Sequence, residues 1–273
     1  MTSSSPRISL IVATYNWPRA LALVLASVRA QRVLPFELIV ADDGSRDDTR
    51  ELIERERALL PVPLVHVWHE DTGFRLAAIR NKAMAAARGD YVVQIDGDIV
   101  LHPEFVHAHT VFAQRGSWVQ GSRALCSEAL TRRLLDGAPA KLGLLTPGLD
   151  NRVNALHAPW LSPFVRGERT ALRRVRGCHM AFWRDDLLRV NGYDEAMEGW
   201  GREDSELASR LCHAGLHRRN LKFSAVCYHL WHRQAGTDAV ARNHERFLQT
   251  VREHRTRCAL GIDQHLSPAE RVA

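Results

Sequence analysis

The stretch ISLIVATYN, residues 8–16, decides the fold of this 273-residue chain. Its first six residues form a run in which Ser9 alone is polar, and such a run is typical of a strand buried on both faces. Three similar runs follow, separated from one another by helical patterns. We predict strands at residues 8–13, 36–41, 64–67 and 91–95, and helices at residues 18–30, 47–58 and 75–87. Strands that alternate with helices predict an α/β fold, with a mostly parallel central sheet flanked by helices.

The pattern is weaker in the rest of the chain. Beyond residue 95 we predict helices at 103–113, 203–214 and 238–258, and strands at 117–121, 177–183 and 222–229. Residues 122–176 are polar, contain several Pro and Gly, and predict no element. The predicted terminal helix is basic, with five arginines: Arg242, Arg246, Arg252, Arg255 and Arg257.

The composition limits the class of protein. Lys and Arg total 37 against 31 Asp and Glu, a formal charge of +6, which suggests attraction to anionic ligands and leaves nucleic acid, anionic lipid and phosphorylated substrates open. The alternative, which is the more common one for such an excess, is a solvated basic face. The five cysteines form no CxxC pair, which argues against a disulfide framework or a zinc ribbon and favours a reducing compartment. No segment approaches the roughly 20 apolar residues that span a bilayer, and residues 1–7 lack the apolar stretch of a signal peptide.

Polar residues end three of the predicted strands. Thr14-Tyr15-Asn16 follows the first, Asp42-Asp43-Gly44-Ser45 the second, and Asp96-Gly97-Asp98 the fourth. Ligands bind beyond the carboxyl ends of the strands in an open parallel sheet, so these segments are candidate ligand contacts. The alternative for each segment alone is turn or helix-cap chemistry, which uses the same residue types.

A metal ion is the expected means of holding phosphate. The chain has no GxGxxG after its first strand and no GxxxxGK[ST], which excludes a dinucleotide fingerprint and a P-loop. Asp96 and Asp98 offer carboxylates to a divalent cation that can bridge to phosphate. His229, in the run YHLWH at 228–232, could complete a site suited to manganese, with His232 in reserve. The alternative is a structural role, which is the more common one for a histidine.

The segment GWGRED, residues 199–204, is the most informative in the chain. Glycines on both sides of Trp200 allow a loop that exposes an aromatic face. Glu203 and Asp204 follow at the start of a predicted helix, where successive side chains point about 100° apart, so at most one faces a given reacting hydroxyl. The alternative interpretation is that both carboxylates only favour the positive end of the helix.

Together these segments resemble the inverting glycosyltransferases of family 2, which have the GT-A fold. The resemblance extends in order over residues 7–232 and rests on four blocks: 8–16 with 40–45, 73–82, 96–98 and 192–204. The last block is similar to the GWGxED block of chondroitin-polymerase domains and β-1,4-galactosyltransferases.

The resemblance implies a role for each matched residue. Asp43 would contact the uracil of a UDP-sugar, and Asp96 would lie near the ribose. Asp98 and His229 would ligate Mn²⁺ or Mg²⁺. Asp204 would be the catalytic base, Glu203 would hold acceptor hydroxyls, and Trp200 would stack on the acceptor sugar. The residues that would line the rest of the nucleotide-sugar site are Ala13, Tyr15, Arg75 and Arg80.

The resemblance also implies the domain layout and the reaction. Residues 6–232 would form one GT-A domain, with a nucleotide-sugar-binding half at 6–105 and an acceptor-binding half at 106–232, before a C-terminal helix and tail at 233–273. The enzyme would move Gal, GalNAc, Glc or GlcNAc from UDP to a saccharide acceptor, in bacterial-type surface polysaccharide or lipopolysaccharide synthesis. We expect a cytoplasmic protein without nucleic acid, whose basic terminal helix could contact anionic lipid at the inner membrane face or a phosphorylated, lipid-linked acceptor.

Other functions fit parts of the sequence. Aspartyl-phosphate phosphatases also use DxD, but theirs follows the first strand and continues to Thr, whereas this one follows the fourth strand and continues Ile99-Val100. A non-catalytic module that binds a UDP-sugar or a saccharide is the second alternative. Two departures from the family are expected: no membrane anchor like that of the galactosyltransferases, and one catalytic domain where the polymerases pair two, which argues against processive synthesis.

Overall fold

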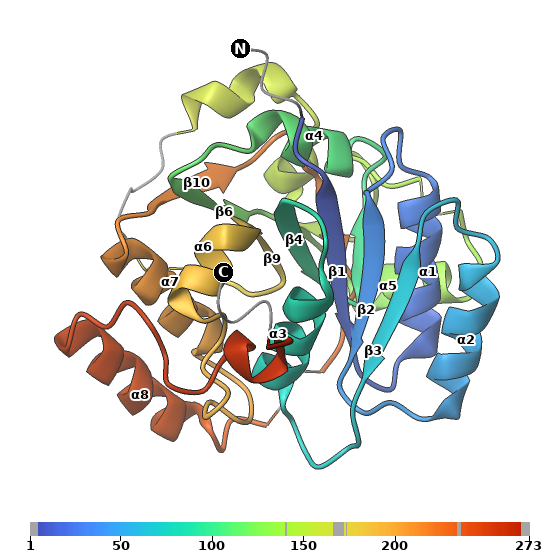
Figure 1. Ribbon diagram of the computed structural model, residues 1–273. Helices are drawn as coiled ribbons and strands as arrows, with labels where there is room; N and C mark the ends of the chain where they lie inside the picture. Colours follow the sequence, from blue (N-terminus) through green and yellow to red (C-terminus); the bar gives the residue numbers. More distant parts are fainter. Residues whose placement is uncertain (1–4, 140, 166–171, 173, 234–235, 269–273) are drawn as a thin grey trace.

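The computed structural model describes residues 5–139, 141–165, 172, 174–233 and 236–268. A seven-stranded sheet with the order β10-β6-β9-β4-β1-β2-β3 lies at its centre (Figure 1). Its strands are β1 (Ile8–Thr14), β2 (Glu37–Asp42), β3 (Leu64–Trp68), β4 (Tyr91–Asp96), β6 (Ser117–Gly121), β9 (His179–Trp183) and β10 (His217–Leu221). β9 is antiparallel to β4 and β6, and the other neighbouring pairs are parallel. The predicted α/β fold with a mostly parallel sheet is confirmed.

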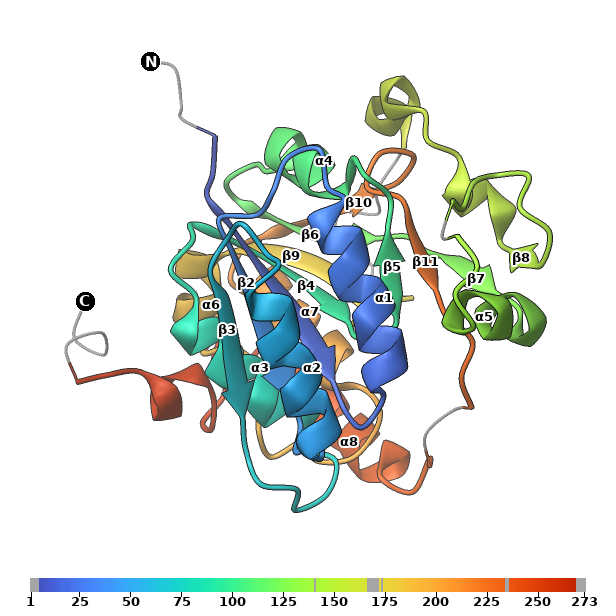
Figure 2. The ribbon, with the colours of Figure 1, turned by 90° about the vertical axis from the view of Figure 1, so that its right-hand side faces the viewer.

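Helices cover both faces of this sheet. On one face lie α1 (Pro18–Arg29) and α2 (Asp47–Arg57), and on the other lie α3 (Leu76–Ala86), α6 (Arg184–Val190) and α7 (Glu203–His213) (Figures 1 and 2). Side chains of a strand alternate between faces, so Leu10 and Val12 of β1 join the core with α1, while Ile11 and Ala13 join the core with α3. Two buried faces explain why this strand is almost entirely apolar.

The first 96 residues follow the predicted order, with element boundaries that differ by one residue at most. The second half contains more helices and strands than its sequence pattern predicts. α4 (Phe105–Phe112) follows the first half, and a second sheet with the order β5-β11-β7-β8 stands beside the main one. Its strands are β5 (Ile99–Leu101), β7 (Ala124–Cys126), β8 (Leu149–Asp150) and β11 (Cys227–His229). Strands of two or three residues are too short to produce a periodic pattern, so this sheet was not predicted.

The stretch 122–176, for which no element was predicted, contains several. Besides β7 and β8 it holds α5 (Glu128–Leu135) and two 3₁₀ turns, η1 (Arg152–Ala155) and η2 (Pro159–Phe164). Residues 140, 166–171 and 173 of this stretch lie outside the described residues.

Two predicted elements are wrong in extent. The strand expected at 222–229 begins only at Cys227, because Phe223 has a φ of +68° and breaks the extended chain after β10. The helix expected at 238–258 is α8 (Val240–Arg252), which ends where His254 adopts a φ of +50°; Arg255 and Arg257 therefore lie beyond it, before η3 (Ile262–His265). Among the described residues, no helix is both long and apolar enough to cross a bilayer.

Strand register brings the predicted polar segments to one edge of the sheet. Ala13 pairs with Asp96, and Thr14 pairs with Asp42, so the carboxyl ends of β1, β2 and β4 are level. β9 runs the other way, and its first residue, His179, pairs with Ile95. The start of β9 therefore lies at the same edge as the ends of the parallel strands.

Asn81 joins α3 to the segment before α7. Its side-chain oxygen accepts from the backbone N–H of Tyr193 at 2.8 Å, and its amide donates to the Tyr193 carbonyl and to Glu195, each at 2.8 Å. Asn81 is completely buried. One side chain thus satisfies both backbone groups of a residue more than 100 positions away in the sequence.

We predict that Asn81→Ala lowers the free energy of unfolding by about 2–4 kcal/mol, because two buried backbone groups of Tyr193 lose their partner. Urea denaturation measures this change. Arg88→Ala, at an exposed position just after the same helix, is the control and should change stability by less than about 0.5 kcal/mol. Equal stability of the two variants would contradict the role of Asn81.

Candidate active site

Asp43, just after β2, is buried and held through both oxygens. Nε2 of His69 lies 2.7 Å from Oδ1, and the backbone N–H of Arg75 donates to Oδ2 at 3.1 Å. Nδ1 of His69 lies 3.2 Å from Nζ of Lys82, which only donates, so the Nε2–H of His69 donates to Asp43. Burial raises the pKa of Asp43 against the effect of these hydrogen bonds. Its oxygens keep further lone pairs, so Asp43 can accept from an N–H of a ligand.

The loops after β1, β2 and β3 meet beside Asp43. The hydroxyl of Tyr15 donates to Asp71 at 2.9 Å, and half of the Tyr15 side chain is exposed. A Cβ atom on Gly44 would lie only 2.7 Å from the backbone of Asp71, so a glycine is needed where these loops touch. An exposed aromatic ring and a buried carboxylate side by side can receive a planar, hydrogen-bonding ring.

Arg75, predicted to line the nucleotide-sugar site, contacts Asp43 through its backbone. Its guanidinium donates to the carbonyl of Glu70 at 2.6 Å, while its backbone N–H donates to Asp43. The guanidinium thus holds the loop after β3, and its charge also opposes the rise that burial causes in the pKa of Asp43.

Arg80 of α3 lies at the centre of the site and is almost completely buried. Its guanidinium donates to Asp96 at 2.7 Å and to Glu203 at 3.4 Å, and it lies 5.3 Å from the ring centre of Tyr193. Burial alone would lower the pKa of Arg80. The electrostatic effects of Tyr193, Asp96 and Glu203 outweigh the effect of burial, so the pKa of Arg80 is raised. A Cβ atom on Gly177 would lie 2.8 Å from Nη1, so the chain before β9 packs directly on the guanidinium. Arg80 therefore remains charged and fixed.

Glu203 and Asp204 begin α7 beside this guanidinium. Burial, and then the negative charge of Asp204, raise the pKa of Glu203 to about 7. Asp204 accepts from the N–H of Gly177 at 2.8 Å and from the N–H of Ser205 at 2.6 Å. Burial raises the pKa of Asp204 despite these bonds. Two coupled carboxyl groups with raised proton affinity are suited to acid–base chemistry near neutral pH.

Asp98 lies against two histidines. Its Oδ2 atom is 3.5 Å from Nε2 of His229 and 3.2 Å from Nε2 of His232, and ligand atoms of the three residues lie within 4.8 Å of one another. The contact arises because β5 and β11 are antiparallel, with Ile99 opposite His229. Oδ1 of Asp98 is buried without a hydrogen-bond partner, and carboxylate with imidazole is a donor set suited to Mn²⁺, so the residues fit a metal ion.

The two histidines differ in protonation. Burial lowers the pKa of His229, whereas the hydrogen bond to Asp98 raises the pKa of His232 to about 9. The neutral imidazole is the form that ligates a metal, so His229 is ready to bind and His232 must first release its proton.

Trp200 lies in the loop before α7, and 44% of its side chain is exposed. Gly199 and Gly201 have φ values of +77° and +108°, which favour glycine and fix the course of the loop. The N–H of Gly199 donates to the carbonyl of Phe74 at 2.9 Å. The loop with Trp200 is therefore attached to the loop that precedes α3, next to the Arg75 N–H that bonds to Asp43.

Three residues that hold the site were not singled out from the sequence. His69 and Tyr193 act through contacts with segments far away in the chain, and Gly177 was read only as the start of a strand. A glycine at the first position of a predicted strand was the one available signal, since a strand glycine often marks a close backbone approach.

The fold is of the GT-A type, and three loops, a carboxylate–histidine cluster and a carboxyl pair meet at one edge of its sheet. A family model for glycosyl transferase family 2 matches residues 9–174, and a model for the N-terminal domain of galactosyltransferase matches residues 166–233. The chain belongs to glycosyltransferase family 2 and is a glycosyltransferase.

Relatives of known activity are similar over most of the chain. Chondroitin synthase of Escherichia coli is 25% identical over 81% of this chain and 34% of its own length. Validoxylamine A glucosyltransferase of Streptomyces hygroscopicus subsp. limoneus is 29% identical over 77% of this chain and 49% of its own length. The chain thus matches half or less of these relatives. The solved structure of GalNAc-T7 with UDP, GalNAc and Mn²⁺ superposes with a TM-score of 0.64 at 14% identity, covering 91% of this chain and 48% of that one.

We predict that Asp98→Asn weakens Mn²⁺ binding, measured by electron paramagnetic resonance with UDP present, by at least about tenfold, because the charged oxygen donor is lost. His229→Ala should cause a similar loss and His232→Ala a smaller one. His102→Ala, which changes a histidine stacked on His157, is the control. Unchanged Mn²⁺ affinity in both Asp98→Asn and His229→Ala would show that the ion binds elsewhere.

Proposed function

We propose that the protein is a metal-dependent inverting glycosyltransferase that uses a UDP-sugar. The donated sugar is Gal, GalNAc, Glc or GlcNAc, and the acceptor is a hydroxyl of a free or lipid-linked saccharide in bacterial-type surface polysaccharide or lipopolysaccharide synthesis. Residues 6–105 provide the nucleotide-sugar half of one domain and residues 106–232 the acceptor half. The similarity to a bacterial chondroitin synthase supports the polysaccharide context.

One observation carries the proposal: the buried guanidinium of Arg80 contacts both Asp96 and Glu203. Asp96 is two residues from Asp98 of the metal cluster, and Glu203 adjoins Asp204 of the carboxyl pair. Arg80 thus links a site for a phosphate-bridging cation to a site for acid–base chemistry. A transferase that breaks a sugar–phosphate bond while deprotonating a hydroxyl needs these two functions side by side.

We assign the role of general base to Asp204. The acceptor oxygen forms a bond to the anomeric carbon as the bond from that carbon to the UDP oxygen breaks, and the hydroxyl proton passes to Asp204. Hydrogen bonds from Gly177 and Ser205 fix the orientation of its carboxylate. Glu203 orients the acceptor, and its charge is balanced by Arg80. A single displacement inverts the anomeric configuration without a covalent intermediate.

The donor is held by groups at the ends of β1, β2 and β4. Asp43 accepts from the uracil, Ala13 and Tyr15 line its pocket, and Asp96 lies near the ribose. Asp98 and His229 are the proposed ligands of Mn²⁺ or Mg²⁺, which when bound supplies positive charge to the phosphates of the leaving UDP. The neighbour solved with UDP and Mn²⁺ supports this choice of donor and metal.

We propose that the protein acts at the cytoplasmic face of the membrane on a lipid-linked acceptor. Its C-terminal arginines are engaged within the protein, and contact of this basic segment with anionic lipid therefore requires some of these pairs to open. The pairs are Arg242 with the Glu198 carbonyl, Arg246 with Asp194, Arg252 with Glu245, Arg255 with Glu253 and Arg257 with Asp263.

The first experiment is UDP release from UDP-glucose, UDP-galactose and their N-acetylamino forms, with Mn²⁺ and with chelator. We expect slow, metal-dependent hydrolysis of one donor, since water can replace the missing acceptor. UDP that binds in the presence of Mn²⁺ without transfer or hydrolysis of any donor would favour a non-catalytic binding module. Absence of UDP binding would contradict the proposed donor.

We predict that Asp204→Asn lowers kcat by about 10²–10⁴-fold, the usual contribution of a general base, with UDP affinity within about twofold of wild type. Steady-state kinetics and calorimetry measure the two quantities. Asp238→Asn is the matched control, because it makes the same change at an exposed position outside the site. Wild-type turnover in Asp204→Asn would disprove the assignment of the base.

The raised pKa of Asp204 predicts the pH dependence. A general base acts when deprotonated, so kcat/KM should rise with pH through a titration above the ordinary range of an aspartate side chain, coupled to that of Glu203. Glu203→Gln removes one negative charge beside Asp204 and frees Arg80 to stabilise the remaining carboxylate, so the rise should move to lower pH. A pH–rate profile identical to that of the wild type would show that Glu203 is not coupled to the base.

A further inference from the structure

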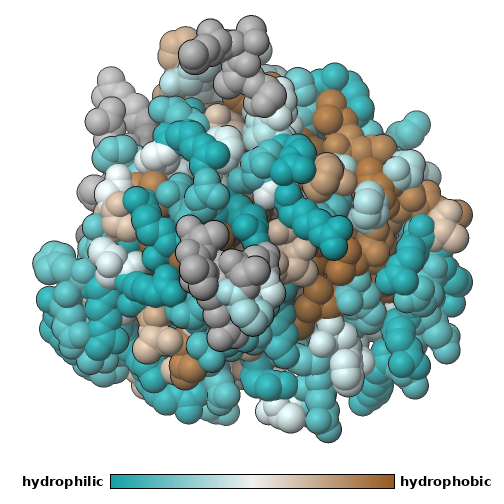
Figure 3. All heavy atoms as spheres, viewed as in Figure 1, coloured by the Kyte–Doolittle hydropathy of each residue, from teal (hydrophilic) through white to brown (hydrophobic). Residues whose placement is uncertain are grey.

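The helix α8 lies against α7, beyond the residues that either family model matches (Figure 1). The outward face of this region is mostly hydrophilic in the space-filling view (Figure 3). The buried residues of α8 are Asn243 and Thr250. Asn243 bonds to the loop that leads into α7, and Thr250 bonds to a residue of α7 itself. The polar contacts of α8 are thus aimed at the acceptor side of the site.

Two side chains of α8 hold the same backbone carbonyl of that segment. The amide of Asn243 donates to the carbonyl of Glu198 at 3.1 Å, and the guanidinium of Arg242 donates to it at 3.0 Å. Glu198 is the residue directly before Gly199. The start of the loop that carries Trp200 is therefore bound to α8.

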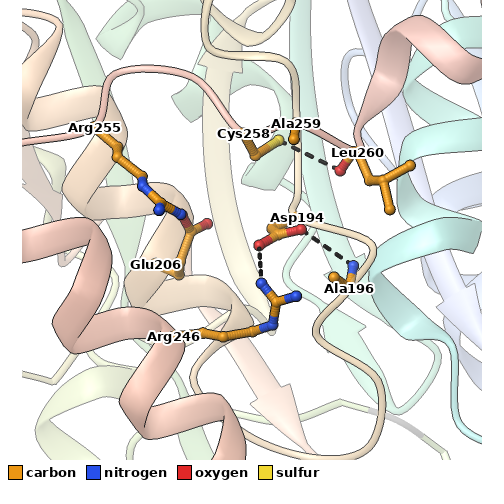
Figure 4. Close-up of a pocket in the computed structure, with 8 residues that line it drawn as sticks. All are labelled: Asp194, Ala196, Glu206, Arg246, Arg255, Cys258, Ala259 and Leu260. Atoms are coloured by element: carbon orange, nitrogen blue, oxygen red, sulfur yellow. Dashed lines mark hydrogen bonds and ion pairs between the residues drawn. The ribbon is translucent and has the colours of Figure 1, made fainter. Parts of the chain in front are cut away.

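An ion pair attaches α8 to Asp194, four residues before Glu198 in the sequence. Nη1 of Arg246 lies 3.5 Å from Oδ2 of Asp194, and the other oxygen of Asp194 accepts from the N–H of Ala196 at 3.1 Å (Figure 4). Asp194 is buried, whereas the Arg246 side chain is partly exposed. A cavity of about 100 Å³ adjoins this pair.

The N-terminal end of α8 fills the space beneath the loop glycines. A Cβ atom on Gly199 would lie 2.4 Å from Cβ of Ala239, and one on Gly201 would lie 3.3 Å from Cγ2 of Val240. These two glycines flank Trp200. The backbone on both sides of the tryptophan is thus in contact with α8.

Contacts at the other end of the loop complete the attachment. The guanidinium of Arg202, the residue before Glu203, lies 5.6 Å from the ring centre of Phe247. The hydroxyl of Thr250 donates at 2.9 Å to Glu206, whose carboxylate forms a buried ion pair with Arg210. The loop is therefore fixed to α8 before Trp200, beneath it and after it.

We propose that α8 positions the acceptor-binding loop, residues 198–204, and that Asn243 and Arg246 are positioning residues for Trp200 and the acceptor. This role rests on the proposed function, in which Trp200 stacks on the acceptor sugar. The groups proposed to hold the donor lie at the ends of β1, β2 and β4 and in and just before α3, and none of them is among these contacts of α8. Loosening α8 should therefore weaken acceptor use and leave donor binding unchanged.

The test compares Arg246→Ala and Arg246→Lys with Arg252→Ala, whose arginine pairs with Glu245 on the exposed side of the same helix. We expect Arg246→Ala to raise the KM for the acceptor about tenfold, since a small displacement of a binding group is costly. UDP affinity and donor hydrolysis without acceptor should stay within about twofold of wild type. With a soluble acceptor and no lipid present, Arg246→Lys, which keeps the positive charge, should restore most of the loss, and Arg252→Ala should behave as wild type.

Hydrogen–deuterium exchange gives a second readout that needs no activity. Peptides covering residues 198–204 should exchange faster in Arg246→Ala than in Arg252→Ala, while peptides of β1 and β2 stay unchanged. Unchanged exchange in the loop would overturn the positioning role, and so would an equal loss of donor hydrolysis and acceptor use. A wild-type protein without transferase activity would instead overturn the proposed function, and the exchange comparison would still decide whether α8 holds the loop.

Discussion

The site depends on one buried cation. A guanidinium removed from water costs several kcal/mol unless charged partners surround it, and Arg80 has Asp96 on one side and Glu203 on the other. These three residues come from α3, from the end of β4 and from the start of α7. The requirement to satisfy one charge therefore fixes three elements at the same point, and a side chain at Gly177 would push the guanidinium from this position.

The same arrangement explains the chemistry. Burial raises the pKa of Asp204 and raises that of Glu203 to about 7, while the charge of Arg80 opposes a further rise in both. Without the cation, two adjacent buried carboxylates would retain protons and could not accept one from a sugar hydroxyl. Arg80 thus makes a buried carboxyl pair usable as a base, and α8 holds the loop beside that pair.

The sequence predicted most of what rests on repeated or local patterns. The first seven elements follow from buried strands and intervening helices, and the polar residues after β1, β2 and β4 follow from the rule that ligands lie at strand ends. What failed depends on long-range contacts: β10 reads HRRNL and carries no apolar pattern, and the short strands β5, β7 and β8 gain their pairing only from the second sheet. The family model and the glycosyltransferase relatives confirm the reaction class, whereas the roles given to Asp43, Asp98 and Asp204 remain predictions. The positions of His69 and Tyr193 could not be predicted, because their partners are set by the fold.

The central claim is that Arg80, Glu203 and Asp204 form one coupled charge cluster. The most direct measurement is a titration of the Glu203 carboxyl by carbon-13 NMR in protein labelled at glutamate, with the signal assigned by its absence in Glu203→Gln. The account predicts an apparent pKa near 7 for this group, about 2–3 units above that of a free glutamate side chain. A titration near pH 4–5, the ordinary range for glutamate, would show that the carboxyl is neither buried nor coupled to Asp204, and would contradict the account.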